Sequence, residues 1–149
     1  MKHFRITLII VSLFALAAVV LSACGPAATP GPVTLTVSGM VGAPLNLTDA
    51  DLHAMKKATV TADQPKVGSQ TFTGVHLSDL LAKAQVQSGA ANLVFSASDN
   101  YSAQIDVATV NGCTDCMVAF TNTAGSYLLV MPNQAGKLWV KNLIKIEVK

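Results

Sequence analysis

Short runs of alternating apolar and polar residues recur from Val33 to the end of the chain. Such alternation is typical of strands with one face buried and the other in water. The strands predicted in this way are 33–37, 58–62, 70–74, 92–97, 101–107, 117–121, 127–131, 137–141 and 143–148. A polar, glycine-containing stretch separates 58–62 from 70–74, so these two strands are expected to pair as a hairpin.

Two short helices are predicted between the strands. Thr48 is a suitable N-cap and Asp51 completes a shortened capping box, which predicts a helix from there to about Lys57. The residues that share one apolar helical face in the predicted helix 75–84 are Leu77, Leu80, Leu81 and Ala84. The stretch 108–115 is expected to be a loop. Many short strands with two short helices indicate an α+β, mostly β, domain.

The first residues have a different pattern, in which Lys2, His3 and Arg5 precede an uncharged apolar run over 6–21. A basic start followed by an apolar run is the layout of an export signal. This run is shorter than the roughly 20 residues of a bilayer-spanning helix. We therefore predict that residues 1–23 are a signal peptide.

Ser22 and Ala23 come directly before Cys24, and this sequence resembles the lipobox at which bacterial lipoproteins are cleaved and lipidated. Cys24 is therefore the predicted lipidation site, and the protein is expected in the cell envelope, outside the cytoplasm and anchored to a membrane. Two acyl chains anchor stably where one chain binds only marginally. The alternative is an uncleaved anchor helix, which also places the domain outside the cytoplasm.

The proline-rich segment 24–32 has no periodicity and is predicted to be a flexible, extended tether. The remainder, 33–149, has room for one domain with a single core. Two of the ten Lys and Arg residues lie in the signal segment, which leaves eight basic against eight acidic residues. This balance gives no basic face for nucleic acid, so no nucleic-acid partner is expected.

Cys113 and Cys116 form a C-x-x-C sequence in the predicted loop before a strand. In an exported protein such a pair can be a structural disulfide, a redox-active dithiol, half of a metal site, or two thiols that never pair. His76, at the start of the second helix, is the histidine that could join them on a metal or contact an anion, or it is simply a surface residue. His53 lies on the polar side of the first helix and is expected to be solvated.

Several segments, in this order, resemble the molybdopterin-binding domain of the sulfite oxidase family of oxidoreductases. The segments are 35–39 (LTVSG), 72–75 (FTGV), 77–81 (LSDLL), 95–102 (FSASDNYS), 129–132 (LVMP), 136–143 (GKLWVKNL) and 146–148 (IEV). Together they span essentially the whole of 33–149. The resemblance implies a mixed α+β domain that holds molybdenum through the dithiolene sulfurs of a pterin, with molybdopterin as the expected cofactor.

The resemblance also implies which residues lie near the pterin. Asp99 and Tyr101 occupy the family's Asp-Gly-Tyr turn, and Lys137 and Lys141 match lysines near the pterin phosphate, for which an ammonium group is a good partner. A turn aspartate, a packed tyrosine and solvated strand ends would explain the same four residues without a ligand. Catalytic members also carry a cysteine that ligates the metal after the strand that is 58–62 here, but the segment 59–69 has none.

Two functions follow from these observations. The first is a lipid-anchored domain that binds a pterin or related ligand through Asp99, Tyr101, Lys137 and Lys141 for redox chemistry with an unknown redox partner. The second is a non-catalytic lipoprotein that keeps the fold without the cofactor and binds a small molecule or a protein partner. The absence of arginine after Arg5, and of the metal-ligating cysteine, favours the second function.

Overall fold

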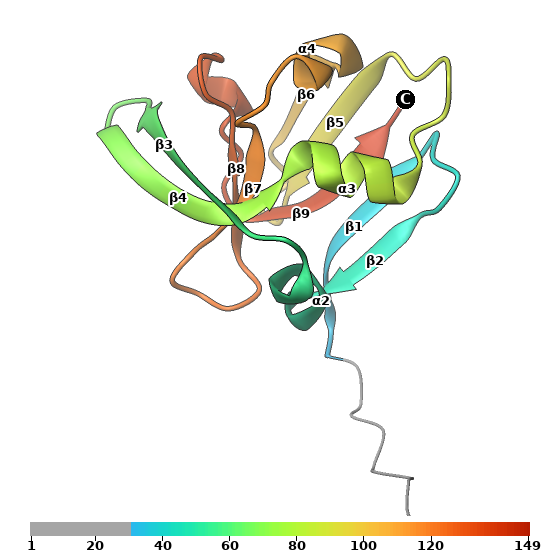
Figure 1. Ribbon diagram of the computed structural model, residues 1–149, viewed down its shortest axis with the longest axis horizontal. Coiled ribbons are helices and arrows are strands. Elements are labelled where there is room, and N and C mark those ends of the chain that lie inside the picture. The colour runs from blue at the N-terminus through green and yellow to red at the C-terminus, as the bar shows by residue number, and fades with distance from the viewer. Residues whose placement is uncertain (1–30) are drawn as a thin grey trace, which may run out of the picture.

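The computed structural model describes residues 31–149, which fold into two β-sheets with a shared core of buried side chains (Figure 1). The predicted signal peptide, Cys24 and most of the predicted tether lie outside these residues. Within 31–149 no helix is long and apolar enough to cross a membrane. The predicted mostly β architecture with short helices is confirmed.

The first sheet has five strands in the order β2-β1-β9-β5-β6. Its strands are β1 (Val33–Gly39), β2 (Leu45–Thr48), β5 (Asn92–Ala97), β6 (Ser102–Asp106) and β9 (Leu143–Val148). The β1–β9 pair is parallel, and the other pairs are antiparallel. Alternation in the sequence translates directly into burial: on β5 the side chains of Leu93, Phe95 and Ala97 face the core.

The second sheet has four strands in the order β3-β4-β7-β8. Its strands are β3 (Ala58–Gln64), β4 (Gly68–His76), β7 (Met117–Phe120) and β8 (Tyr127–Val130). The predicted hairpin is present and longer than expected, because the ladder continues to the Gln64–Gly68 pair and closes in a tight turn at Lys66, whose φ is 68°. We call β3, β4 and the turn that joins them the hairpin arm. Figure 1 shows it projecting from the body of the domain.

The two predicted helices are present but shorter than expected. Thr48 caps α2 (Asp49–Ala54) through the predicted capping box, since its hydroxyl accepts from the Asp51 N–H while its own N–H donates to the Asp51 carboxylate. The helix ends three residues before Lys57 because Met55 is already extended. The second helix, α3 (Leu77–Ala84), begins after His76, which still pairs with Met117 of β7.

Two elements correct the sequence prediction. The stretch expected to be a loop contains a one-turn helix, α4 (Val107–Asn111), whose β-branched residues have low intrinsic helix propensity. The predicted strand 137–141 is instead a 3-10 turn, η1 (Gly136–Leu138), followed by a segment that pairs with β8 in a single isolated bridge, Leu128–Lys141.

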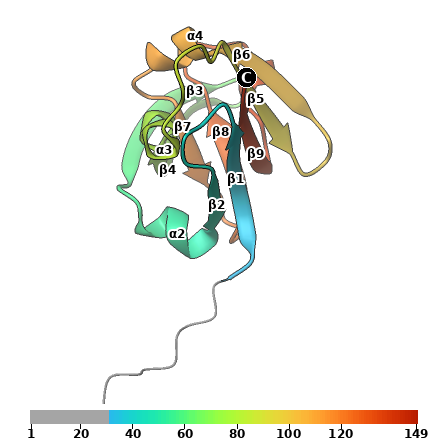
Figure 2. The same ribbon diagram turned by 90° about the vertical axis from the view of Figure 1, so that its right-hand side faces the viewer.

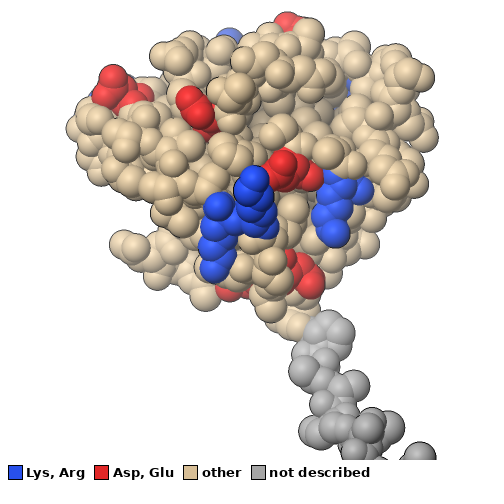
Figure 3. Space-filling model, in the orientation of Figure 1, with Lys and Arg blue, Asp and Glu red and all other residues tan. Residues whose placement is uncertain are grey.

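The end of the domain at which β1 begins carries α2 and the β7–β8 turn, as the two ribbon views agree (Figures 1 and 2). Figure 3 shows one face of the domain, on which most of the surface is uncharged and the few Lys side chains have Asp or Glu side chains close by.

Candidate functional site

The turn between β5 and β6 meets the η1 segment, and this contact brings together three of the four residues predicted to bind the pterin. The Tyr101 hydroxyl donates to the backbone carbonyl of Lys137 at 2.6 Å. Asp99 accepts from the Tyr101 N–H at 3.0 Å, and Asn100 between them has a left-handed backbone with φ of 68°. The Tyr101 hydroxyl and the Lys137 backbone therefore bond to each other directly.

The hairpin arm packs on the same η1 segment from another side. The Phe72 ring meets the Trp139 ring edge to face at 5.6 Å, and a side chain at Gly136 would contact the Pro65 ring at 3.1 Å. Trp139 is 8% exposed, yet its Nε1 has no hydrogen-bond partner among the described residues. The segment that carries Lys137 is thus held between the β5–β6 turn and the hairpin arm.

Lys141, the fourth predicted pterin-binding residue, lines a different feature. It borders an open cavity of about 280 Å³ together with residues of the β7–β8 turn and β8. The other lining residues are Thr121, Ser126, Tyr127, Leu128 and Asn142. The structure places Asp99, Tyr101 and the Lys137 backbone in one cluster, and Lys141 on this separate cavity.

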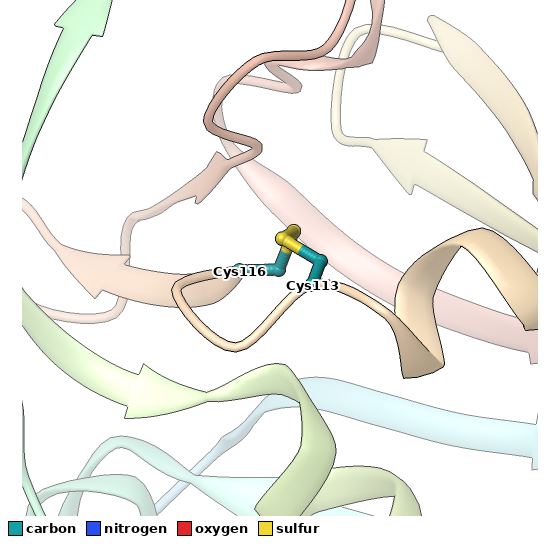
Figure 4. The surroundings of a disulfide bond; sticks show 2 residues. All are labelled: Cys113 and Cys116. Atoms are coloured by element: carbon teal, nitrogen blue, oxygen red, sulfur yellow. A yellow bond between two sulfur atoms is a disulfide. The ribbon is translucent and has the colours of Figure 1, made fainter.

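Cys113 and Cys116 are joined by a disulfide in the loop between α4 and β7 (Figure 4). Cys113 is half-buried and borders a small cavity of about 160 Å³, whereas Cys116 is 1% exposed. Two sulfurs joined in this way offer no thiolate, which is the form that binds a metal.

His76 lies at the N-cap position of α3 without capping it, and its Nδ1 is buried with no hydrogen-bond partner among the described residues. The neighbouring Leu77 N–H donates to the Cys116 carbonyl at 2.9 Å, so His76 and the disulfide lie on adjoining segments. Across residues 31–149, no three His, Cys, Asp or Glu side chains gather closely enough to hold a metal ion. The predicted metal site of His76, Cys113 and Cys116 is therefore not assembled in this structure.

A polar cluster that the sequence did not indicate joins the two sheets beside α2. Asp49 Oδ1 accepts from the Tyr127 hydroxyl at 2.8 Å and from the Gly125 N–H at 3.0 Å. The Tyr127 hydroxyl also bonds the Thr34 hydroxyl at 2.7 Å. Burial is the main cause that raises the pKa of Tyr127 to about 12, and the hydrogen bond to Asp49 and the charge of its carboxylate raise the pKa further, whereas the bond with Thr34 lowers it.

His53 belongs to the edge of the same cluster. Its ring stacks on Phe120 with centroids 3.9 Å apart, and its Nε2 is 3.8 Å from Asp49. The prediction that His53 is solvated holds in part, since 44% of the side chain remains exposed. Helical periodicity could not reveal this contact, because Phe120 is distant in the sequence and belongs to β7 of the second sheet.

A cavity of about 670 Å³ lies between α3 and α4. It is lined by Ser78, Leu81, Ala82, Gln85, Val86, Gln87, Ser88, Gly89, Ala90, Val107 and Asn111. None of these side chains is charged, and the amides and hydroxyls among them can both donate and accept hydrogen bonds.

Comparison with known families decides what kind of domain this is. The family model described as "Oxidoreductase molybdopterin binding domain" matches residues 25–149. The chain belongs to this family. The sequence resemblance to the molybdopterin-binding domain of sulfite oxidase-type enzymes is thereby confirmed.

A solved structure of similar fold is the sulfane dehydrogenase SoxCD from Paracoccus pantotrophus, with a TM-score of 0.66 and 23% sequence identity. The match covers 76% of this chain and 37% of the SoxCD chain, so this family member spans little more than a third of that protein. At this identity the likeness shows the fold alone. No curated protein matches the chain.

Within residues 31–149, the side chains of this family member do not form a ligand set for a protein-bound molybdenum centre. The segment in which catalytic relatives carry the metal-ligating cysteine is here the uninterrupted ladder of the hairpin arm, with Ala62 buried on its inner side. The two cysteines of the domain are bonded to each other, and no arginine follows Arg5. We therefore derive no reaction step through molybdenum.

Proposed function

We propose that this family member is an extracytoplasmic lipoprotein, anchored to a membrane through Cys24, whose domain binds a small molecule or a protein partner without molybdenum chemistry. The lipid anchor is inferred from the sequence of residues 2–24, and the observation that argues against a bound pterin is the 2.6 Å contact between the Tyr101 hydroxyl and the Lys137 carbonyl. A pterin inserted between these two groups would have to break that bond, and Phe72 and Pro65 of the hairpin arm cover the same segment.

The cavity between α3 and α4 has the size and the lining of a site for a small ligand. Its volume of about 670 Å³ lies within the range of roughly 300–1,000 Å³ that small-molecule sites have. Because Gln85, Gln87 and Asn111 contribute amides and no lining residue is charged, the cavity suits a neutral ligand rich in hydroxyl or amide groups.

The lipid anchor has a direct test that needs no knowledge of the ligand. In the host's envelope, mass spectrometry of the most N-terminal peptide should find a chain that begins at acylated Cys24. The matched variant Cys24→Ser should keep residues 1–23, because the peptidase needs the modified cysteine. An unmodified Cys24 in a chain that still carries residues 1–23 would contradict the proposal and support the uncleaved anchor helix.

A second function is pterin binding without a protein thiolate. It is favoured by the match of the family model to 25–149 and by two buried nitrogens, His76 Nδ1 and Trp139 Nε1, that have no partner within the described part of the chain. Phe72, which packs on Trp139, shares one face of β4 with His76, because side chains alternate along a strand. The pterin content of the purified protein separates the two functions: its presence at near one equivalent establishes the second, and its absence from folded protein excludes it.

A further inference from the structure

We propose that Cys113 and Cys116 are a thiol–disulfide exchange site, in which Cys113 is the sulfur that a partner dithiol attacks. This activity is separate from ligand binding and from any pterin. It rests on three features of the loop between α4 and β7: the unequal exposure of the two sulfurs, the hydrogen bonds that hold the backbone on both sides, and the cavity beside Cys113.

The two cysteines differ in access. Cys113 is half-buried and borders the cavity of about 160 Å³, whereas Cys116 is 1% exposed and lies within the core. Figure 4 shows the disulfide lying across the mouth of the loop, between the end of α4 and the start of β7. Thiol–disulfide exchange depends on access to the attacked sulfur, so an external thiol should react at Cys113.

The loop does not depend on the disulfide for its shape. The Cys113 N–H donates to the Val110 carbonyl at 3.0 Å, and the Cys116 carbonyl accepts from the Leu77 N–H at 2.9 Å. Stabilisation of a folded chain by a disulfide grows with the length of the loop that it closes, and this one closes only 113–116. The bond can therefore open and close while the domain stays folded.

The exchange runs through a mixed disulfide. One thiolate of the partner dithiol attacks Cys113 Sγ, a bond forms between these two sulfurs, the Cys113–Cys116 bond breaks, and Cys116 leaves and takes up a proton. The second partner thiolate then attacks the partner's own sulfur in the mixed disulfide and releases Cys113, which also takes up a proton. The partner dithiol is oxidised to a disulfide, and two electrons and two protons pass to the cysteine pair.

The cavity beside Cys113 sets the charge that such a partner should have. Its lining is polar, from Thr109, Thr114, Asn133 and Gln134, and its one ionisable side chain other than cysteine is that of Asp115. The Asp115 carboxylate repels an incoming thiolate that carries further negative charge. A neutral or positively charged dithiol is therefore the preferred partner.

The first test uses the wild-type, full-length chain in detergent. Dithiothreitol, a neutral dithiol, should reduce the pair without denaturant, and tryptophan fluorescence and circular dichroism should remain those of the folded protein. Substoichiometric iodoacetamide, followed by peptide mapping, should then label Cys113 about tenfold or more over Cys116, because thiol reactivity follows exposure. Reduction only under unfolding conditions, or equal labelling of the two cysteines, would overturn the proposal.

Two matched variants test which sulfur forms the mixed disulfide. With oxidised glutathione, Cys116→Ser, which retains Cys113, should form the mixed disulfide about tenfold or more faster than Cys113→Ser, which retains Cys116. Equal rates in two folded variants would contradict the assignment of Cys113. If either variant fails to fold, the labelling ratio in the wild type still decides the question.

Rates of reduction by charged and by neutral thiols distinguish an electrostatic role of Asp115 from a purely structural one. Asp115→Asn should accelerate reduction of the disulfide by anionic glutathione about two- to fivefold at low ionic strength, and change the rate with neutral 2-mercaptoethanol little. Glu147→Gln, which removes a carboxylate on β9, should leave both rates unchanged. Equal acceleration with both thiols would refute the charge argument.

Discussion

Replacing Tyr127 by phenylalanine tests whether the polar cluster beside α2 joins the two sheets. Tyr127 has no exposed surface, and its hydroxyl bonds both the Asp49 carboxylate and the Thr34 hydroxyl. Bonds to a charged group contribute about 1.5–3 kcal/mol and neutral ones about 1 kcal/mol. Asp49 keeps the Gly125 N–H after the substitution, so we expect Tyr127→Phe to lower the free energy of unfolding by about 2–3 kcal/mol at pH 8.

The raised pKa of Tyr127 gives this prediction a pH dependence of defined sign. In the folded protein the hydroxyl stays protonated to about pH 12, but in the unfolded chain it ionises near 10. Wild-type stability from this group is therefore complete below pH 10 and is lost as the pH rises toward 12. A full pKa unit corresponds to about 1.4 kcal/mol, but the unfolded group is only half ionised at pH 10, so the difference in free energy of unfolding between wild type and Tyr127→Phe should narrow by about 1 kcal/mol between pH 10 and 11.

Urea unfolding followed by Trp139 fluorescence measures both effects. Tyr101→Phe is the matched control at pH 8, because Tyr101 is 42% exposed and donates a single bond to a carbonyl, and it should cost at most about 1 kcal/mol. If Tyr127→Phe is no more destabilising than Tyr101→Phe, or if its gap to the wild type does not narrow at alkaline pH, the reasoning about the cluster is wrong.

Four further predictions concern stability. Cys113→Ser combined with Cys116→Ser should lower the free energy of unfolding by only about 2 kcal/mol, the chain-entropy value for a loop of 113–116, and a loss that abolishes folding would contradict the independent support of this loop. Thr48→Ala should lower the free energy of unfolding by about 1 kcal/mol through loss of the capping box. Hydrogen bonds from the Thr48 side chain and backbone lower the pKa of Asp51, so the stability that Asp51 contributes is present above its unfolded pKa near 3.8 and is lost as the pH falls further. Urea titrations in acid would refute this if the difference in free energy of unfolding between wild type and Asp51→Asn did not narrow. Gly74→Ala should cost about 1–3 kcal/mol or more in thermal unfolding, because its Cβ would strike the Val118 carbonyl. In the control Gly112→Ala the Cβ would make only ordinary van der Waals contacts and φ is ordinary, so stability should change by less than about 1 kcal/mol.

Alternation was sufficient to predict most of the strands because each has one buried face. β5 and β9 show this most clearly, with Leu93 and Phe95 on one strand and Ile146 and Val148 on the other facing the same core. The capping box could also be predicted from the sequence, since Thr48 and Asp51 are only three residues apart and bond to each other. Local rules failed where tertiary contacts determine the backbone conformation. The segment 137–141 has the alternating pattern of a strand, but the chain forms the 3-10 turn η1 packed against the hairpin arm.

The candidate site was less accessible to sequence reasoning. The segment resemblance placed Asp99 and Tyr101 near Lys137 correctly, yet it could not show that the Tyr101 hydroxyl would bond the Lys137 backbone or that Lys141 would line another cavity. The cluster of Asp49, Tyr127 and Thr34 was missed altogether. Its members come from α2, β8 and β1, and no periodicity within one element relates them.

The central claim, that this family member keeps the fold without binding molybdenum or a pterin, is tested most directly by cofactor content. The full-length chain would be produced in cells that make molybdopterin, purified in detergent without oxygen, and assayed for molybdenum and tungsten by mass spectrometry and for oxidised pterin by fluorescence. The same chain from cells that cannot make molybdopterin is the control. We predict background metal and pterin from both cell types in folded protein; near-stoichiometric metal and pterin from the first alone would contradict the account.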